Sequence, residues 1–377
     1  MPSFLLTIDV EDWFQVENLR PWIPFSTWDS RELRVEANVH KLLDLFDGVK
    51  FNAPNPECIN PENPVNPVAK FSSSVPRSNP TNSTNPIIPT NRSLRATFFV
   101  LGWIAKRLPH LVREIATRGH EVASHGSSHR MCNGLPDPEL RSELSGSKHL
   151  LEDIIGTEVA GFRAPNFSVD DRVLGIIREC GYRYDSSYNT FALHGRYGKI
   201  SLNGQPKAGI AYKLTDDFFE LPLSNLPLST LVTLGTRNFS HSNSGTFNVM
   251  QFRHFPLPWG GGAYFRLMPL SIFTMGVRSI LNSNGAYVFY MHPWEIDPGQ
   301  PKVKQASPGS RLKHYKNIAT TEAKLKKLIG SFADCRFVTC KDYINAGARL
   351  TEKGLLSPYI HEIRDCATTA RINLKNA

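Results

Sequence analysis

The chain has 377 residues, of which 41% are hydrophobic and 20% are charged, as in ordinary globular proteins. Its 43 Lys and Arg outnumber its 34 Asp and Glu, and the formal charge of +9 favours an anionic partner. Because the basic residues are spread along the chain without a dense block, we expect a solvated surface and no nucleic-acid binding. The six cysteines form no CxxC pair, which argues against a disulfide framework and a thiolate zinc site.

The N-terminal residues match neither a secretory signal nor a membrane span. A signal peptide would show a basic start, a longer apolar run and a small-residue cleavage site, whereas here Asp9 directly follows a short apolar run at residues 4–8. No apolar stretch in the sequence is long enough to cross a bilayer. We therefore predict a cytoplasmic protein without a transmembrane segment.

Predicted strands and helices alternate over the first half of the chain. Short apolar runs without helical periodicity predict strands at residues 4–8, 96–100, 121–124, 159–163 and 182–185. Apolar residues at helical spacing predict helices at residues 31–47, 104–118, 138–155 and 170–180. This alternation is typical of parallel βαβ units that form a barrel or an open sheet.

An insertion and a less regular region interrupt the alternation. Residues 52–92 are rich in Asn, Pro and Ser, and proline removes backbone donors while few apolar residues remain to bury. We predict a disordered insertion there, within one catalytic domain made of residues 1–48 and 94–345. Residues 190–265 show no clear helix. Further elements are predicted at residues 269–284, 287–291, 315–330 and 336–339, and residues 346–377 form a polar C-terminal tail.

Four polar clusters directly follow predicted strands. They are DVED (9–12), HGSSH (125–129), RAPNF (163–167) and HPWE (292–295). In α/β barrels the loops that follow the carboxyl ends of the strands assemble the active site. We therefore expect the four clusters to meet in one cleft.

The two histidines of HGSSH indicate a metal site. The Gly and Ser residues between His125 and His129 are poor helix formers, so we expect a turn that brings both rings to one point. Two imidazoles and one carboxylate form a three-ligand zinc site. One carboxylate of DVED could bind the metal while another acts as a base. The alternative is that these are solvent-facing loop histidines and ordinary surface acids.

The other two clusters offer supporting groups. Arg163 could keep a catalytic carboxylate ionised or form a structural ion pair. Pro165 stiffens its turn, so backbone N–H groups beyond it, at Asn166 or Phe167, could bind an oxyanion. His292 could protonate a leaving amine, or it could be a hydrogen-bonded structural residue.

In this order the motifs resemble those of the polysaccharide deacetylase family, the NodB-homology carbohydrate esterases. The resemblance rests on TIDVED, ATFFVLG, GHEVASHGSSH, GFRAPNFS, YRYDSS and FYMHPWE. DVEDWFQV, RATFFVLGW, GGGAYFR and HPWEID are similar to a bacterial branch associated with exopolysaccharide synthesis and exosortase systems. The resemblance covers about residues 3–48 and 94–345 and omits the insertion.

The resemblance implies a distorted (β/α) barrel with fewer than eight strands and a divalent metal, usually zinc. Asp9 matches the catalytic base, Arg163 the arginine that steadies it, and His292 the general acid. His125 and His129 match the metal-binding pair.

The first motif departs from the family pattern: many relatives have two adjacent aspartates there, whereas Val10 follows Asp9 here. We expect Asp12 to be the third ligand, with Glu11 as the alternative.

The implied activity is a hydrolase that acts on non-peptide C–N bonds. It would remove N-acetyl groups from an N-acetylated oligo- or polysaccharide, or its precursor, in exopolysaccharide biosynthesis. Trp294 could stack on a sugar ring or belong to the core. The alternatives are a hydrolase of another non-peptide amide and an inactive carbohydrate-binding scaffold of the same fold.

Overall fold

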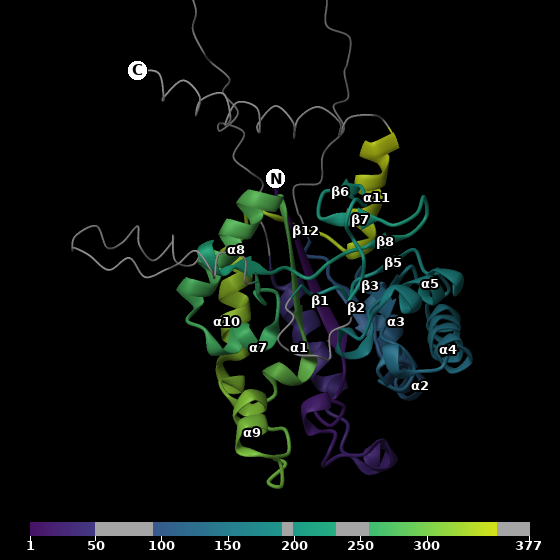
Figure 1. Cartoon of the computed structure of the whole chain (residues 1–377). Helices are drawn as coiled ribbons and strands as arrows, with labels where there is room; N and C mark the ends of the chain where they lie inside the picture. Colours follow the sequence, from purple (N-terminus) through teal and green to yellow (C-terminus); the bar gives the residue numbers. More distant parts are fainter. Residues whose placement is uncertain (50–92, 191–198, 231–255, 353–377) are drawn as a thin grey trace, which may run out of the picture.

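The computed structural model describes residues 1–49, 93–190, 199–230 and 256–352, with one mixed sheet at their centre and helices around it (Figure 1). The predicted insertion at residues 52–92 and most of the predicted tail lie outside the described residues. No helix of the described ranges is both long and apolar enough to span a bilayer.

Strand β1 (Ser3–Val10) is at the centre of the sheet. It pairs in parallel with β11 (Ala286–Met291) along one edge and with β2 (Thr97–Val100) along the other, and β12 (Arg336–Phe337) pairs with its first residues. Beyond β2 the parallel order continues through β3 (Glu121–Ser124), β4 (Gly161–Phe162), β5 (Tyr184–Asp185) and β8 (Phe219–Glu220). Two antiparallel strands, β7 (Ala211–Lys213) and β6 (Lys207–Ala208), complete the sheet, and β9 (Leu226–Pro227) pairs separately with β10 (Pro256–Leu257).

The sheet curls strongly. Arg163, directly after β4, lies 2.7 Å from Asp9 of β1, Nη1 to Oδ1. These strands are three positions apart, which is about 14 Å in a flat sheet. An arginine side chain cannot cover that distance, so the sheet bends around its inner face. The pairing runs from β11 to β6 without closing among the described residues, and it confirms the predicted distorted barrel.

The side chains of β1 divide the core into two layers. Phe4, Leu6 and Ile8 belong to the large apolar cluster between the sheet and the helices. Leu5 belongs to a smaller cluster on the inner face, and Asp9 extends the same face at the carboxyl end of the strand. The inner face is therefore apolar near the start of β1 and polar at the carboxyl end of the strand, where the predicted clusters lie.

The predicted helices correspond to α1 (Val35–Asp47), α2 (Gly102–Arg107) with α3 (Pro109–Thr117), α4 (Asp137–Ile155), α5 (Asp171–Glu179), α8 (Leu270–Asn284) and α10 (Ile318–Gly330). Three further helices were not predicted: α7 (Gly262–Leu267), α9 (Pro308–Tyr315) and α11 (Cys340–Glu352).

Three predicted boundaries are wrong. The helix predicted at residues 104–118 is two helices, because Leu108 precedes a proline and leaves the helical region. The helix predicted at residues 315–330 is also divided, at Asn317, whose φ is 61°. Helix α11 continues past residue 345, where the tail was predicted to begin.

Candidate active site

The loop after β3 carries both predicted metal-binding histidines. Glu143 of α4 accepts hydrogen bonds from the backbone N–H groups of Ser127 and Ser128, at 3.0 and 2.9 Å. His129 lies in the left-handed region with a φ of 58°, so the loop turns and does not continue as a helix. The ring centroids of His125 and His129 consequently lie 5.4 Å apart.

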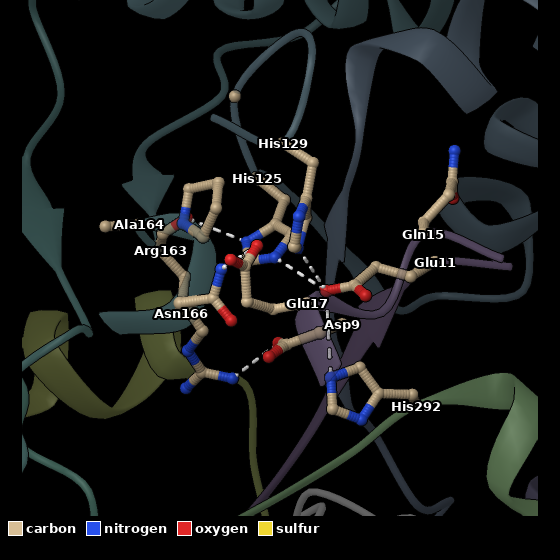
Figure 2. Close-up of polar contacts among 12 residues, drawn as sticks. Asp9, Glu11, Gln15, Glu17, His125, His129, Arg163, Ala164, Asn166 and His292 are labelled. Carbon is tan, nitrogen blue, oxygen red and sulfur yellow. Dashed lines mark hydrogen bonds and ion pairs between the residues drawn. The ribbon is translucent and has the colours of Figure 1, made fainter. Parts of the chain in front are cut away.

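Glu11 supplies a carboxylate at the same point. Its Oε1 lies 3.0 Å from Nε2 of His125 and 2.9 Å from Nε2 of His129, and all three residues are buried (Figure 2). One ligand atom from each residue lies within 4.8 Å of the other two. Two imidazoles and one carboxylate are also the ligand types of many catalytic zinc sites. The three residues therefore form a candidate metal site.

Asp12, which the sequence analysis favoured as the third ligand, lies elsewhere. Its Oδ2 accepts hydrogen bonds from the backbone N–H groups of Arg34 and Val35, at 2.7 and 2.9 Å, and its Oδ1 accepts one from Trp13 at 2.8 Å. Asp12 thus satisfies donors at the start of α1, whose own N-cap residue, Arg34, forms no side-chain capping bond. Glu11 replaces Asp12 as the candidate ligand, because alternation along β1 puts position 11 on the inner face.

The hydrogen bonds around these ligand atoms fit a cation. Nδ1 of His125 lies 2.8 Å from the carbonyl oxygen of Arg163, so Nδ1 donates and Nε2 is the ring atom directed at Glu11. Nε2 faces a carboxylate oxygen at 3.0 Å, a contact that requires a proton or a metal ion between the two atoms. Burial would raise the pKa of Glu11, but nearby histidines, chiefly His129 and His292, outweigh it and hold the pKa well below its usual range. The carboxylate is therefore ionised.

Arg163 and Asp9 form a buried ion pair beside the candidate ligands (Figure 2). The guanidinium also donates to the hydroxyl group of Thr7 and to two oxygens of Ser186, and it lies 4.1 Å from the ring centre of Phe99. These contacts hold Arg163 in one orientation, and Arg163 in turn orients the carboxylate of Asp9. The structure thus brings together the two residues that the sequence analysis paired.

His292 follows β11 and lies across from Glu11 (Figure 2). Its Nε2 lies 3.7 Å from Oε1 of Glu11, and its Nδ1 lies 3.0 Å from Oε1 of Glu295. Burial would lower the pKa of His292, but the carboxylates of Glu11 and Glu295 outweigh it and raise the pKa to about 9. The imidazole is therefore protonated at neutral pH, as a general acid requires.

The pair of residues that supports His292 was missed by sequence reasoning. Glu295 accepts a hydrogen bond from Nε of Arg266 at 2.7 Å, and both residues are buried. Arg266 also donates to the carbonyl oxygens of residues 313, 314 and 316. A Cβ at Gly262 would lie 2.3 Å from Oε1 of Glu295, so the glycine run makes room for this carboxylate. The motifs GGGAYFR and HPWE contained both residues, but nothing in either pattern indicated that they pair.

The RAPNF segment forms part of the cleft wall. Asn166 and Phe167 line the cavity described below, while Pro165 is buried behind it, on the side of Gly126. The N–H group of Phe167 donates to the carbonyl oxygen of Ala164 at 2.9 Å, so it is not available to an oxyanion. Of the two predicted oxyanion donors, the backbone N–H group of Asn166 remains the candidate. Asn166 and Phe167 have φ values of 56° and 58°, a strained conformation that is enriched at functional sites.

Trp294 lines the same cavity but offers little surface to a sugar. Its ring stacks on those of His292 and His314, with centroid distances of 5.2 and 4.2 Å, and only 5% of the residue is exposed. The predicted stacking of Trp294 on a sugar ring is therefore replaced by another role. Trp294 packs against His292, the general-acid candidate, and helps to hold its ring in place.

These groups share a cavity of about 340 Å³, a size typical of small-molecule sites. We call it the metal pocket. Residues that line it include Asp9, Glu11, Glu17, His125, His129, Asn166 and His292. Glu17, which the sequence analysis did not single out, accepts a hydrogen bond from Nδ2 of Asn166 at 3.4 Å and projects toward it (Figure 2).

Two family models match the chain. Residues 79–184 match the polysaccharide deacetylase model, and residues 246–345 match a domain of unknown function, DUF3473. The first match contains HGSSH and RAPNF, and the second contains GGGAYFR and HPWE. The two matched regions therefore meet in the metal pocket.

Individual proteins with deacetylase names are also similar. A peptidoglycan-N-acetylglucosamine deacetylase of Bacillus cereus is 31% identical over 88 residues, which are 23% of this chain and 41% of that protein. A chitooligosaccharide deacetylase of Azorhizobium caulinodans is 30% identical over 92 residues, which are 24% of this chain and 44% of that protein. The chain thus spans less than half the length of these curated relatives.

Among solved structures, a putative polysaccharide deacetylase from Mycobacterium smegmatis has a TM-score of 0.48 and 18% identity, and the match covers 93% of this chain and 91% of that one. The motifs at residues 96–102, 119–129 and 161–168 lie within the region that matches the polysaccharide deacetylase model. Residues 79–184 of this chain are therefore similar to the polysaccharide deacetylase family.

Proposed function

We propose that the protein is a metal-dependent N-deacetylase that removes acetyl groups from amino sugars of a polysaccharide or its precursor. One observation carries the proposal: Glu11, His125 and His129 converge in a pocket that also contains the carboxylate of Asp9, which Arg163 holds in place, and the imidazole of His292. The deacetylase names of the curated relatives support the reaction class.

Glu11, His125 and His129 would hold the metal, and this ligand set favours Zn²⁺. A bound divalent ion would polarise the acetamide carbonyl group and lower the pKa of water.

The chain's own residues divide the proton transfers between them. Asp9, oriented by Arg163, accepts a proton from the attacking water. His292 donates a proton to the leaving amine, and Glu295 holds its Nδ1 so that Nε2 faces the pocket. The N–H group of Asn166 stabilises the oxyanion that develops on the substrate.

The biological role is part of the same proposal. The similarity of GGGAYFR and HPWEID to the exopolysaccharide-associated branch supports a role in exopolysaccharide biosynthesis. The cytoplasmic location stays a prediction.

Acetate release tests the proposal. The purified chain, loaded with Zn²⁺, should release acetate from N-acetylated glycans, and Asp9→Asn should lower turnover by about two to four powers of ten while zinc stays bound. Elemental analysis of both proteins is the control. A zinc-loaded protein that releases no acetate from any N-acetylated saccharide would contradict the proposal, as would a fully active Asp9→Asn variant.

A further inference from the structure

Two buried carboxyl groups that the proposed mechanism does not use lie side by side in the sheet. Asp185 ends β5 and Glu220 ends β8, and the two residues are direct partners in the parallel register of these strands. Both side chains are fully buried. Their carboxyl groups lie within hydrogen-bonding distance of each other. We call Asp185 and Glu220 the carboxyl pair.

The hydrogen bonds around the carboxyl pair leave one oxygen without a donor. Asp185 accepts through both oxygens from Ser187, at 2.7 Å from the hydroxyl group and 3.0 Å from the backbone N–H group. Oε1 of Glu220 accepts from the backbone N–H group of Tyr188 at 2.9 Å. Oε2 of Glu220 is buried, and no N–H or O–H group of the described residues donates to it. A proton on this oxygen would give it a partner, because the O–H group could donate to Asp185.

The charges around the carboxyl pair also favour one shared proton. Two buried carboxylates in contact repel each other, so one of the two keeps a proton at a pH where an isolated carboxyl group is ionised. Burial, and then the charge of Asp185, raise the pKa of Glu220 well above its usual range. The charge of Arg163 acts on both groups, but its guanidinium donates to Asp9 and Ser186.

Two other titratable groups that interact with the carboxyl pair carry no charge at neutral pH. Burial raises the pKa of the Cys132 thiol, which interacts with Asp185. Burial also raises the pKa of the Tyr188 hydroxyl group, which interacts with Glu220. Neither group can therefore serve as a counter-ion for a second negative charge.

The carboxyl pair joins two strands at the place that holds Arg163. The seam between β5 and β8 is short, with two pairs of partner residues. Just beyond it, Oγ of Ser186 donates to the carbonyl oxygen of Leu221 at 2.9 Å. Ser186 in turn accepts two hydrogen bonds from Arg163, at 2.9 and 3.0 Å. The position of Arg163 thus depends on how β5 and β8 meet.

The carboxyl pair and Ser186 lie on opposite faces of the sheet. Tyr184 and Phe219, which precede the two carboxyl residues, belong to the cluster on the inner face. Alternation therefore directs the carboxyl pair to the outer face and Ser186 back to the inner face, where it meets Arg163. Any effect of the carboxyl pair on the reaction must consequently act through Ser186 and Arg163.

From this geometry we infer that Glu220 holds a proton that it shares with Asp185, and that the pair positions Arg163. Arg163 in turn orients Asp9, the proposed base. Loss of the proton would put two adjoining anions at the ends of two short strands, and their repulsion would displace Ser186. The positioning role rests on the proposed function, whereas the shared proton does not.

Infrared spectroscopy of the full chain at neutral pH tests the shared proton. A protonated carboxyl group gives a C=O stretching band that a carboxylate lacks. We expect this band in the spectrum of the parent protein minus that of Glu220→Gln. A difference spectrum without the band would overturn the inference, whatever the activity of the protein.

The control variant is Glu152→Gln on α4. Burial would raise the pKa of Glu152, but the hydrogen bond from Lys148 outweighs it and lowers the pKa, so this carboxylate is ionised. Removing it should leave both the band and acetate release unchanged.

Two substitutions at Glu220 test the positioning role on the zinc-loaded full chain. Glu220→Gln keeps a neutral donor, because Tyr188 holds the carbonyl oxygen and the amide N–H group replaces the O–H group. Glu220→Leu removes the donor. With the β-1,4-linked tetramer of N-acetylglucosamine, we expect kcat to stay within about threefold in Glu220→Gln and to fall about ten- to a hundredfold in Glu220→Leu. KM and zinc content should change less than about twofold in both, because the carboxyl pair touches neither substrate nor ligands.

An equal loss of kcat in both variants would show that position 220 needs a charge and would overturn the inference. Full activity of Glu220→Leu would overturn the positioning role. If Glu220→Leu does not fold, Glu220→Gln decides alone, since retained kcat supports a neutral donor and a tenfold loss excludes it. A parent protein that releases no acetate would refute the proposed function and the positioning role with it, while the infrared band would still decide the shared proton.

Discussion

The N-terminal and C-terminal parts of the chain each form one side of the metal pocket, and the two sides differ in how their charges are balanced. On the N-terminal side, Glu11, His125 and His129 direct one potential ligand atom each at the same point, within 4.8 Å of one another. On the C-terminal side, the carboxylate of Glu295 is already neutralised by Arg266 and by protonated His292. The first side presents three ligand atoms to an external cation, whereas the charges of the second side are paired with each other within the chain. From this difference we predict which substitutions should lower zinc binding and which should lower only the rate of the reaction.

The largest effect should come from removing the carboxylate of the N-terminal side. Glu11→Gln should lower zinc content well below one ion per chain and reduce acetate release at least about a thousandfold, because the site loses its only charged ligand. Elemental analysis and the acetate assay measure the two effects.

Asp12→Ala is the control variant for that test, because it removes the neighbouring carboxylate. It should keep zinc and lose about 1–3 kcal/mol of unfolding free energy, because it removes the acceptor at the start of α1. The opposite result, with zinc lost in Asp12→Ala and kept in Glu11→Gln, would restore Asp12 as the ligand.

On the C-terminal side, Glu295→Gln should keep zinc bound but lower kcat about ten- to a hundredfold. Burial favours neutral His292, and the carboxylate of Glu295 opposes that effect by raising the pKa of His292. Because the acid must be protonated, activity falls as the pH rises through this pKa. The variant should therefore lose activity at a lower pH than the parent protein. A pH profile of kcat checks this, and an unshifted alkaline limb would exclude Glu295 as the positioning residue.

A smaller effect on the N-terminal side should come from Glu143, which binds the HGSSH loop without touching the metal ligands' ring atoms. Glu143→Gln should weaken zinc affinity about ten- to a hundredfold, as supporting residues of metal sites do, and saturating zinc should restore kcat. Competition with a chelator measures the affinity. A loss of kcat that zinc cannot rescue would show that Glu143 acts on the chemistry itself.

The smallest expected effect concerns the pH dependence of the free energy of unfolding, through the buried residue His120 outside the active site. Burial lowers the pKa of His120 to about 4, against about 6.5 in an unfolded chain. Between these values the unfolded chain binds more protons, so stability is complete above pH 6.5 and is lost as the pH falls towards 4. We expect His120→Asn, which keeps an acceptor for the N–H group of Ala96, to flatten this dependence by about 1–3 kcal/mol. Urea unfolding at pH 7 and pH 4.5 measures it, and parallel curves for both proteins would contradict the assignment.

Much of the N-terminal side could be predicted from sequence because each feature is local. The HGSSH spacing, the apolar runs before each polar cluster and the alternation of β1 all act over a few residues. Alternation along β1 favours Glu11, but it does not exclude that Asp12, which lies beyond the strand, turns towards the histidines. The choice depends on where α1 begins, because the free N–H groups of Arg34 and Val35 attract Asp12 from 22 residues away.

The C-terminal side escaped prediction for the same physical reason. Glu295 and Arg266 are separated by 29 residues, and each resembles an ordinary surface charge until the fold buries both. Trp294 is of a residue type that often stacks on sugars, but its ring already stacks on the rings of His292 and His314.

The amino-acid sequence alone determined the resemblance to the polysaccharide deacetylase family, the alternation of strands and helices, and the four polar clusters at strand ends, since these follow from local patterns and motif order. Only the tertiary structure decided which carboxylate faces the histidines, which charges support the general-acid candidate, and that Asp185 and Glu220 lie side by side. Those properties arise from the curl of the sheet, which brings residues from distant strands within hydrogen-bonding distance, and no local pattern encodes that curvature.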